Sequence, residues 1–184
     1  MLGFFPKSTV AIEGKSSEQW SLTRSSKSRT TSSVNSQYQA LVPKNTVATK
    51  GDIITIDSEK YFVTAIERSF VNTVAKLYKA NCIISIAEIK KHFTSGVNDY
   101  LYESPVATSI PAYFEEVTAK MQQWDQGLLA TTTTRFLVSD NTAVKATYRI
   151  KNGTENAIVN GVNTSNFPGL LWVQCTIDTR VTKV

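Results

Sequence analysis

The side chains that could carry out catalysis or bind a metal are few and scattered in this chain. His92 is the single histidine, and its neighbours Lys90 and Lys91 are not metal ligands. A catalytic dyad or a zinc site would place a histidine near a cysteine, a serine nucleophile or acids at ligand spacing. The sequence offers no such grouping, so we interpret His92 as a solvent-facing histidine.

The cysteines, acids and glycines give the same result. Cys82 and Cys175 lie in separate apolar runs, which is typical of buried, reduced thiols. Glu115 and Glu116 are adjacent, and adjacent residues of a strand point to opposite faces, so they could not line one pocket there. The eight glycines are scattered and form no phosphate-binding loop, and no calcium-binding loop occurs. We therefore predict no enzyme, no cofactor and no metal site.

The net charge of +5 belongs to the first 50 residues of the 184. That part holds seven basic and two acidic side chains, whereas the remaining thirteen basic residues are balanced by thirteen acids. Such an asymmetry indicates a basic arm or loop that meets something anionic, rather than a basic fold.

The most polar part of this basic region is the Ser/Thr-rich segment 21–36, which we expect to be a long flexible loop. Its basic residues Arg24, Lys27 and Arg29 could contact phosphates without reading bases. The alternative is a solvated loop that contacts nothing. No aromatic residue lies between Trp20 and Tyr38, which argues against a single-strand-binding module. Passing duplex DNA or an acidic partner subunit fits the segment better.

The remaining pattern predicts an all-β fold. Hydrophobic residues make up 41% and charged residues 19% of the chain, a composition that suits half-buried strands. Residues 53–56 and 61–66 are β-branched and aromatic runs around the polar residues 57–60, which predicts a hairpin. Residues 82–86 complete a block of closely spaced strands. This spacing favours a small β-barrel or sandwich over alternating strands and helices.

Further strands are expected from the same signals, and two segments stay ambiguous. The other predicted strands are 9–12, 18–22, 38–42, 74–80, 132–138, 143–150, 157–159 and 169–177. Polar turns are expected at 151–153 and 160–161. Residues 88–97 read as a helical turn or a loop. Residues 111–126 fit helical spacing and strand alternation about equally.

Residues 51–68 resemble the first hairpin of neck proteins from tailed bacteriophages, of the head-closure or stopper type. The residues that carry the likeness are the Gly-Asp pair Gly51 and Asp52, followed after a strand and a tight turn by Tyr61 and Val63. Residues 110–113, 134–138, 148–150 and 169–173 are similar to extended members of this group. The resemblance implies that 110–126 is strand.

The resemblance implies a structural virion protein, made in the host cytoplasm and residing in the neck, that joins head to tail and helps retain DNA. The implied partners are further copies in a ring, a portal or adaptor protein, a tail tube or tail-terminator protein, and packaged double-stranded DNA. A tail-terminator or tail-completion protein is the alternative within the structural class. A nucleic-acid-binding barrel is the alternative from another class.

The sequence also suggests how the chain is organised. We expect a barrel in 1–109, with 21–36 as its loop, and a second β block in 110–184. Trp20, Trp124 and Trp172 are candidate core or interface residues.

No apolar run reaches about eighteen residues, which predicts no membrane span, and the first residues do not read as a signal peptide.

Overall fold

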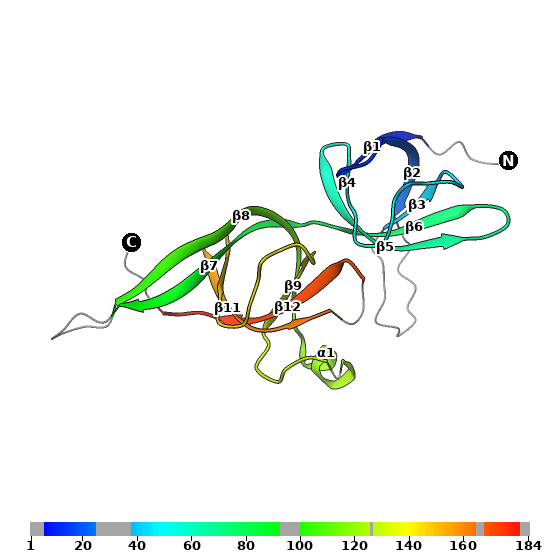
Figure 1. The fold of residues 1–184 in the computed structure, drawn as a ribbon. Coiled ribbons are helices and arrows are strands. Elements are labelled where there is room, and N and C mark those ends of the chain that lie inside the picture. The colour runs from blue at the N-terminus through cyan, green and yellow to red at the C-terminus, as the bar shows by residue number, and fades with distance from the viewer. Residues whose placement is uncertain (1–5, 25–37, 93–99, 126, 165–167, 181–184) are drawn as a thin grey trace. The chain divides into compact units, whose positions relative to one another are not determined.

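The computed structural model of the chain describes residues 6–24, 38–92, 100–125, 127–164 and 168–180. It confirms the all-β prediction, because its strands form two closed six-stranded antiparallel barrels. The chain divides into two compact units. Unit 1 holds residues 1–80 and 165–170, and unit 2 holds residues 81–164 and 171–184. Each unit has a hydrophobic core of its own, and Figure 1 shows the strands of both barrels.

Unit 1 is the barrel that contains the predicted hairpin. Its strands are β1 (Ser8–Ile12), β2 (Glu18–Arg24), β3 (Tyr38–Val42), β4 (Ile53–Ile56), β5 (Glu59–Arg68) and β6 (Thr73–Lys79). They neighbour one another in the order β1-β2-β3-β6-β5-β4, and β4 pairs with β1 to close the wall. Asp57 and Ser58 join β4 to β5 with positive φ angles of 49° and 69°, as the two-residue turn of a twisted hairpin requires. The predicted hairpin is confirmed, with a shorter turn.

The core of unit 1 forms from the alternate side chains that each strand turns inward. Trp20 is fully buried, and it packs in one cluster with Ile54, Tyr61 and Leu77. Trp20 is therefore a core residue of this barrel.

Glu18 ties the Trp20 ring to the loop between β3 and β4. One carboxylate oxygen of Glu18 accepts hydrogen bonds from Trp20 Nε1 at 2.7 Å and Thr46 Oγ1 at 2.6 Å, and the other accepts from the Val47 amide at 2.7 Å. Burial by itself raises the pKa of Glu18, but these three hydrogen bonds outweigh it, so the pKa lies below its usual value.

Replacing Glu18 by Gln should destabilise unit 1 at pH 7 by about 1.5–3 kcal/mol, because an amide cannot accept three hydrogen bonds through both of its terminal atoms. A folded-state pKa below the unfolded one contributes stability above the unfolded pKa, and this contribution is lost as pH falls through the folded value. The difference between wild type and E18Q should therefore shrink between pH 7 and pH 3 in urea unfolding. A difference independent of pH would contradict the ionised role of Glu18.

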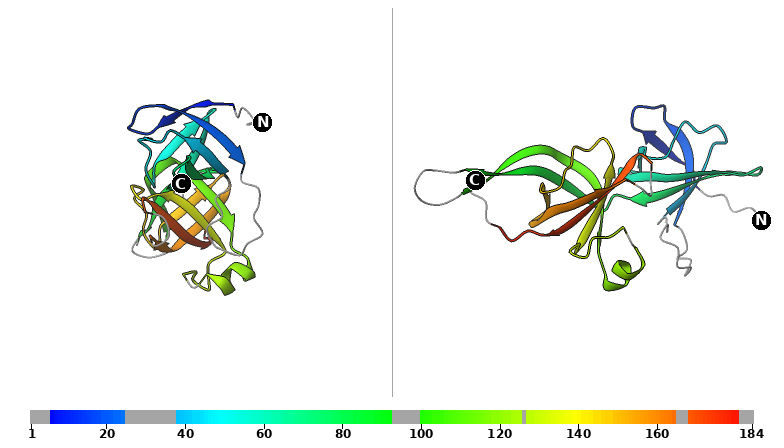
Figure 2. Two further views of the ribbon diagram at one scale, coloured as in Figure 1. Left: turned by 90° about the vertical axis from the view of Figure 1, so that its right-hand side faces the viewer. Right: turned by 60° about the horizontal axis from the view of Figure 1, so that its bottom comes forward.

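Unit 2 is the second barrel, and its strands continue the chain. They are β7 (Cys82–His92), β8 (Tyr100–Glu116), β9 (Thr134–Ser139), β10 (Arg149–Asn152), β11 (Glu155–Asn163) and β12 (Leu170–Ile177). The wall runs β10-β11-β12-β9-β8-β7 and closes through the pairing of β10 with β7. Figure 2 gives two further views of the strands.

A short helix, α1 (Ala119–Trp124), lies outside this wall between β8 and β9. Thr118 caps it, and its six residues include none that is buried. Within the described residues, the structure contains no helix with the length and apolar character of a membrane span.

The two barrels have the same topology. In each unit the first strand pairs with the second and the fourth, the third with the sixth, and the fifth with the fourth and the sixth. The hydrogen bonds repeat as well. Gly51 N donates to Val63 O and Thr147 N donates to Val159 O, both at 2.8 Å. Gly51 and Thr147 both have positive φ, 90° and 76°. These positions are 96 residues apart (51 and 147, 63 and 159), so the chain contains an internal structural repeat.

A β-bulge also recurs at the matching place. The pairing of β5 with β6 shifts register between Val63 and Ala65, and that of β11 with β12 shifts between Val159 and Gly161. The turn predicted at 160–161 is therefore wrong, because Gly161 continues β11 past this bulge. The turn predicted at 151–153 is present one to two residues later, since Lys151 and Asn152 belong to β10 and residues 153–154 form the turn between β10 and β11.

Other sequence predictions need correction. The boundary at 109/110 would cut strand β8, whereas the units divide between residues 80 and 81. Residues 21–24 of the expected loop belong to β2, because they pair with β3. Residues 88–92 are strand, paired with β8. The segment 111–126 is strand up to Glu116 and helix from Ala119. Residues 143–148 are outside any strand, since β10 begins at Arg149.

Candidate interaction site at one end of the second barrel

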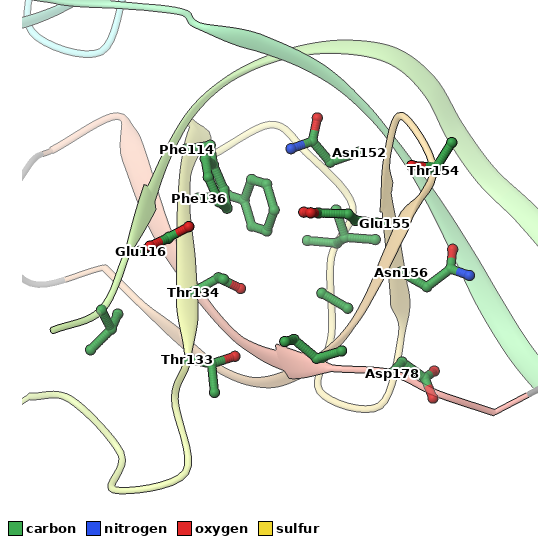
Figure 3. A pocket seen from close by; sticks show the side chains of 14 residues that line it. Phe114, Glu116, Thr133, Thr134, Phe136, Asn152, Thr154, Glu155, Asn156 and Asp178 are labelled. Atoms are coloured by element: carbon green, nitrogen blue, oxygen red, sulfur yellow. The ribbon is translucent and has the colours of Figure 1, made fainter.

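One end of the unit 2 barrel is open and forms a hollow of about 520 Å³. Its apolar lining includes Phe114, Phe136 and Ile150, and its polar lining includes Glu116 and Glu155. Figure 3 shows these side chains, with the Glu155 carboxylate directed toward Phe136. Unit 1 has the equivalent strands with different side chains. Comparing the two units therefore shows which side chains differ at this end.

The corresponding end of unit 1 can be located by following the strand pairing. Ile56, just before the hairpin turn, pairs with Val10, and Val10 pairs with Glu18. Six residues further along β2, Arg24 pairs with Tyr38. Tyr38 therefore stands at the barrel end that the hairpin turn also borders.

The same path in unit 2 starts at Asn152, the residue before the matching turn. Asn152 pairs with Ile84, and Ile84 pairs with Ile110. Six residues further along β8, Glu116 pairs with Thr134. Thr134 therefore occupies the position that Tyr38 has in unit 1.

Two tyrosines pack against each other at this end of unit 1. The rings of Tyr38 and Tyr61 meet edge to face, with centroids 5.5 Å apart, an arrangement that aromatic pairs favour. Tyr61 is 96 positions before Ala157, so Thr134 and Ala157 replace the tyrosine pair in unit 2. Both small residues line the hollow. The hollow therefore lies where unit 1 has its tyrosine pair, and in unit 2 the rings of Phe114 and Phe136, with centroids 5.3 Å apart, line it instead.

The loss of the aromatic pair leaves a polar atom without a partner. Thr134 Oγ1 is buried and makes no hydrogen bond within the described residues. Buried polar groups in native proteins are nearly always paired. The wall of the hollow thus carries an unused hydrogen-bonding group.

The charges at the two ends differ in the same way. In unit 1, Glu59 accepts hydrogen bonds from Lys79 Nζ and from the Tyr61 hydroxyl at 3.0 Å. The Lys79 hydrogen bond, joined by that of Tyr61, lowers the pKa of Glu59. In unit 2, Glu155 matches Glu59 and Ile177 matches Lys79. Ile177 pairs with Ala157 in the same way that Lys79 pairs with Tyr61.

Glu155 has therefore lost its cation in unit 2. Glu116 and Glu155 are exposed, and neither carboxylate takes part in an ion pair or hydrogen bond within the described part of the chain. Ile177, in the place of Lys79, is 65% exposed. The hollow thus has an apolar floor and two unpaired carboxylates at its rim. Such a site suits an apolar side chain that carries a cation beside it.

The third acid near the hollow is already neutralised. Asp178 accepts hydrogen bonds from Arg149 Nε at 2.9 Å and from Arg180 Nη2 at 2.8 Å. The Arg180 hydrogen bonds, together with those of Arg149, hold the pKa of Asp178 well below its usual range. Arg149 is 1% exposed and also donates to Glu103 Oε1 at 2.6 Å. This buried cluster is structural, because each of these charges has a partner.

A second ion cluster fixes α1 to the outside of the barrel. Arg135 lies 4.1 Å from the centroid of the Trp172 ring, and it pairs with Glu115 and with Asp125 at the end of α1. Trp172 is buried beneath this cluster, while Trp124 on α1 is 75% exposed. Of the three tryptophans, only Trp124 is available at the surface.

Among the described residues, the most exposed apolar side chains lie at the tip of the β5–β6 hairpin in unit 1. Phe70 and Val71 are 97% and 88% exposed. Ser69 and Asn72 hold this tip, because Ser69 N and Ser69 Oγ both donate to Asn72 O, at 2.8 and 2.9 Å. The tip therefore presents two large apolar residues on an ordered turn. We refer to residues 68–72 as the hairpin tip.

The remaining sequence-predicted residues fall in different places. Gly51 and Asp52 pair with Val63 in the wall of unit 1, and Asp52 also pairs with Lys15 at 2.7 Å. Arg24 ends β2, and only its backbone is described. Lys27 and Arg29 lie outside the described residues, and so does the side chain of His92.

Burial changes the acidity of both cysteine thiols. Burial raises the pKa of Cys82 to about 11 and that of Cys175 to about 12, so both are protonated at neutral pH. Both are free cysteines. Among the described residues, no three His, Cys, Asp or Glu side chains are grouped so that they could hold a metal ion.

Comparison of the chain with protein-family models and with curated proteins finds no match. Sequence reasoning did not identify the hollow or the hairpin tip. The tip does carry a signal in the sequence, since Phe70 and Val71 are adjacent apolar residues between the turn-forming residues Ser69 and Asn72. The hollow carries no such signal in the sequence, because Thr134 and Ala157 are informative only when they are compared with Tyr38 and Tyr61 at the matching positions of unit 1.

Proposed function

We propose that this protein is a structural subunit of the neck of a tailed phage, of the head-closure type, that assembles as a ring around the DNA channel. The observation that carries the proposal is the block 51–68. The resemblance implies a first hairpin of a small β-barrel there, and β4 and β5 form a hairpin in the closed wall of unit 1. A rigid closed barrel leaves no unpaired strand edge, which suits a wall component.

The proposal is supported by the surface features as well. A ring needs two different surfaces on each copy, because each subunit contacts its neighbours head to tail. The hairpin tip and the hollow are two such surfaces on one chain.

Electron microscopy of lysates from a phage that lacks this gene tests the proposal. Filled or leaking heads separated from finished tails are the expected result. Heads joined to tails of abnormal length would favour the tail-terminator alternative. Complete tailed particles would reject a role in the neck.

Replacing Arg24, Lys27 and Arg29 together by Ser should impair DNA retention or docking without unfolding the protein, because the change removes three positive charges from the basic segment. The measurement is phage titre, with DNA release from heads as the second readout. The matched control is the triple replacement of Lys50, Lys120 and Lys145 by Ser, which removes three exposed charges elsewhere. Equal titres for the two triple variants would show that the basic segment has no special role.

A further inference from the structure

We infer that the hairpin tip of one copy inserts into the hollow of unit 2 in a second copy, with Phe70 on the apolar floor and Arg68 beside the rim carboxylates. This inference deepens the proposed ring and rests on it for the identity of the partner, a second copy of this chain. It concerns the contact between subunits, which the proposed function leaves open.

The internal repeat indicates what the hollow accepts. In unit 1 the same barrel end holds the Tyr61 ring, and the cation of Lys79 neutralises Glu59. In unit 2, Ala157 and Ile177 stand in place of Tyr61 and Lys79, so the ring and the cation at these two positions are both missing, and the rings of Phe114 and Phe136 supply apolar lining. An aromatic side chain accompanied by a positive charge would therefore restore the arrangement of unit 1.

The hairpin tip supplies this pair of groups. Phe70 is 97% exposed, and Arg68, two residues before it, is exposed and has no ion-pair partner within the described residues. Burying one aromatic side chain removes about 150–250 Å² from water, which makes Phe70 a suitable anchor for a contact between subunits. The rim of the hollow offers Glu116 and Glu155 to Arg68, so the two surfaces also match in charge.

Trp124 is the other strongly exposed aromatic residue among those described, at 75%. It is a weaker candidate, because its helix is held to the wall of unit 2 through Asp125 and Arg135. It therefore serves as the matched control.

Sedimentation velocity on the full chain tests the contact with three single variants. Phe70→Ser removes the inserted ring, and Ala157→Tyr fills the hollow with the residue that unit 1 carries there. Each should weaken self-association at least about 30-fold, as expected for an interface hot spot. Trp124→Ser should leave it unchanged. Circular dichroism checks that each variant is folded.

Mixing the two defective variants gives the sharper result. F70S keeps an intact hollow and A157Y keeps an intact tip, so an equimolar mixture should form one-to-one dimers that cannot grow further. If A157Y does not fold, E116K/E155K replaces it, since both carboxylates are exposed. In that case R68E should restore association when mixed with E116K/E155K.

Three outcomes would overturn the inference. The first is a wild-type protein that stays monomeric at about 100 μM, where a contact of micromolar Kd would be saturated. The second is self-association of F70S as strong as that of the wild type. The third is the absence of a dimer in the mixture of F70S and A157Y. These outcomes are separate from those of the neck experiment. Phe70-dependent association with normal necks in the gene-deleted phage would retain the contact and reject the proposed function.

Discussion

Replacing Arg149 by Met should destabilise unit 2 by about 3 kcal/mol, because removing one member of a buried ion cluster leaves the others without compensation. Arg149 is 1% exposed and pairs with both Asp178 and Glu103. Met preserves most of the volume and removes only the charge and the hydrogen bonds. Urea unfolding measures the loss, and hydrogen exchange should place it in the strands of unit 2.

The control is Lys151→Met, which removes another partner of Glu103. Lys151 is 41% exposed at its side chain, so this variant should lose less than about 1 kcal/mol. A loss for R149M as small as that for K151M would contradict the structural role of the cluster.

The same cluster should make unit 2 sensitive to acid. Because the folded pKa of Asp178 is depressed, its contribution to stability is present above the unfolded pKa and is lost as pH falls toward the folded value. R149M should therefore show a flatter dependence of stability on pH than wild type. In a double-mutant cycle, Asp178→Asn should cost less in the R149M background than in wild type.

Replacing Gly51 by Ala should destabilise unit 1 by more than about 3 kcal/mol, for two physical reasons. Its φ of 90° is in the region that costs a residue with a Cβ about 1–2 kcal/mol. An added Cβ would also lie 2.5 Å from the Cα of Gly169, within the same unit. Backbone cannot move aside as a flexible side chain can, so urea unfolding should reveal a large loss.

Gly14→Ala separates the two causes. Gly14 has a φ of 73°, and a Cβ added there would meet nothing within 4 Å, so this variant carries the conformational cost alone. Thr147, at the matching position of unit 2, adopts a φ of 76° with a side chain. A residue with a side chain is thus tolerated at this backbone conformation. Equal losses of stability for G51A and G14A would contradict a steric cost from the close approach to Gly169.

Local patterns were sufficient to predict the hairpin of β4 and β5. Residues 53–56 and 61–66 are β-branched and aromatic, and polar residues separate them, so the strands and the turn follow from short-range preferences. The turn between β10 and β11 was predicted one to two residues early, because Asn152 still belongs to β10. Where local signals conflicted, prediction was incomplete. Residues 88–92 are polar in part, and only their pairing with β8 makes them strand.

The all-β character, the hairpin of β4 and β5 and the asymmetry of charge were determined by the sequence alone, because each depends on residue type and near neighbours. The division at residues 80/81, the repeated topology and the hollow were decided only by tertiary structure. Matching hydrogen bonds relate Gly51 to Thr147 and Tyr61 to Ala157, although these side chains have little in common. Backbone pairing can be preserved while side chains change, and the hollow of unit 2 lies where Thr134 and Ala157 stand in place of the tyrosine pair of unit 1.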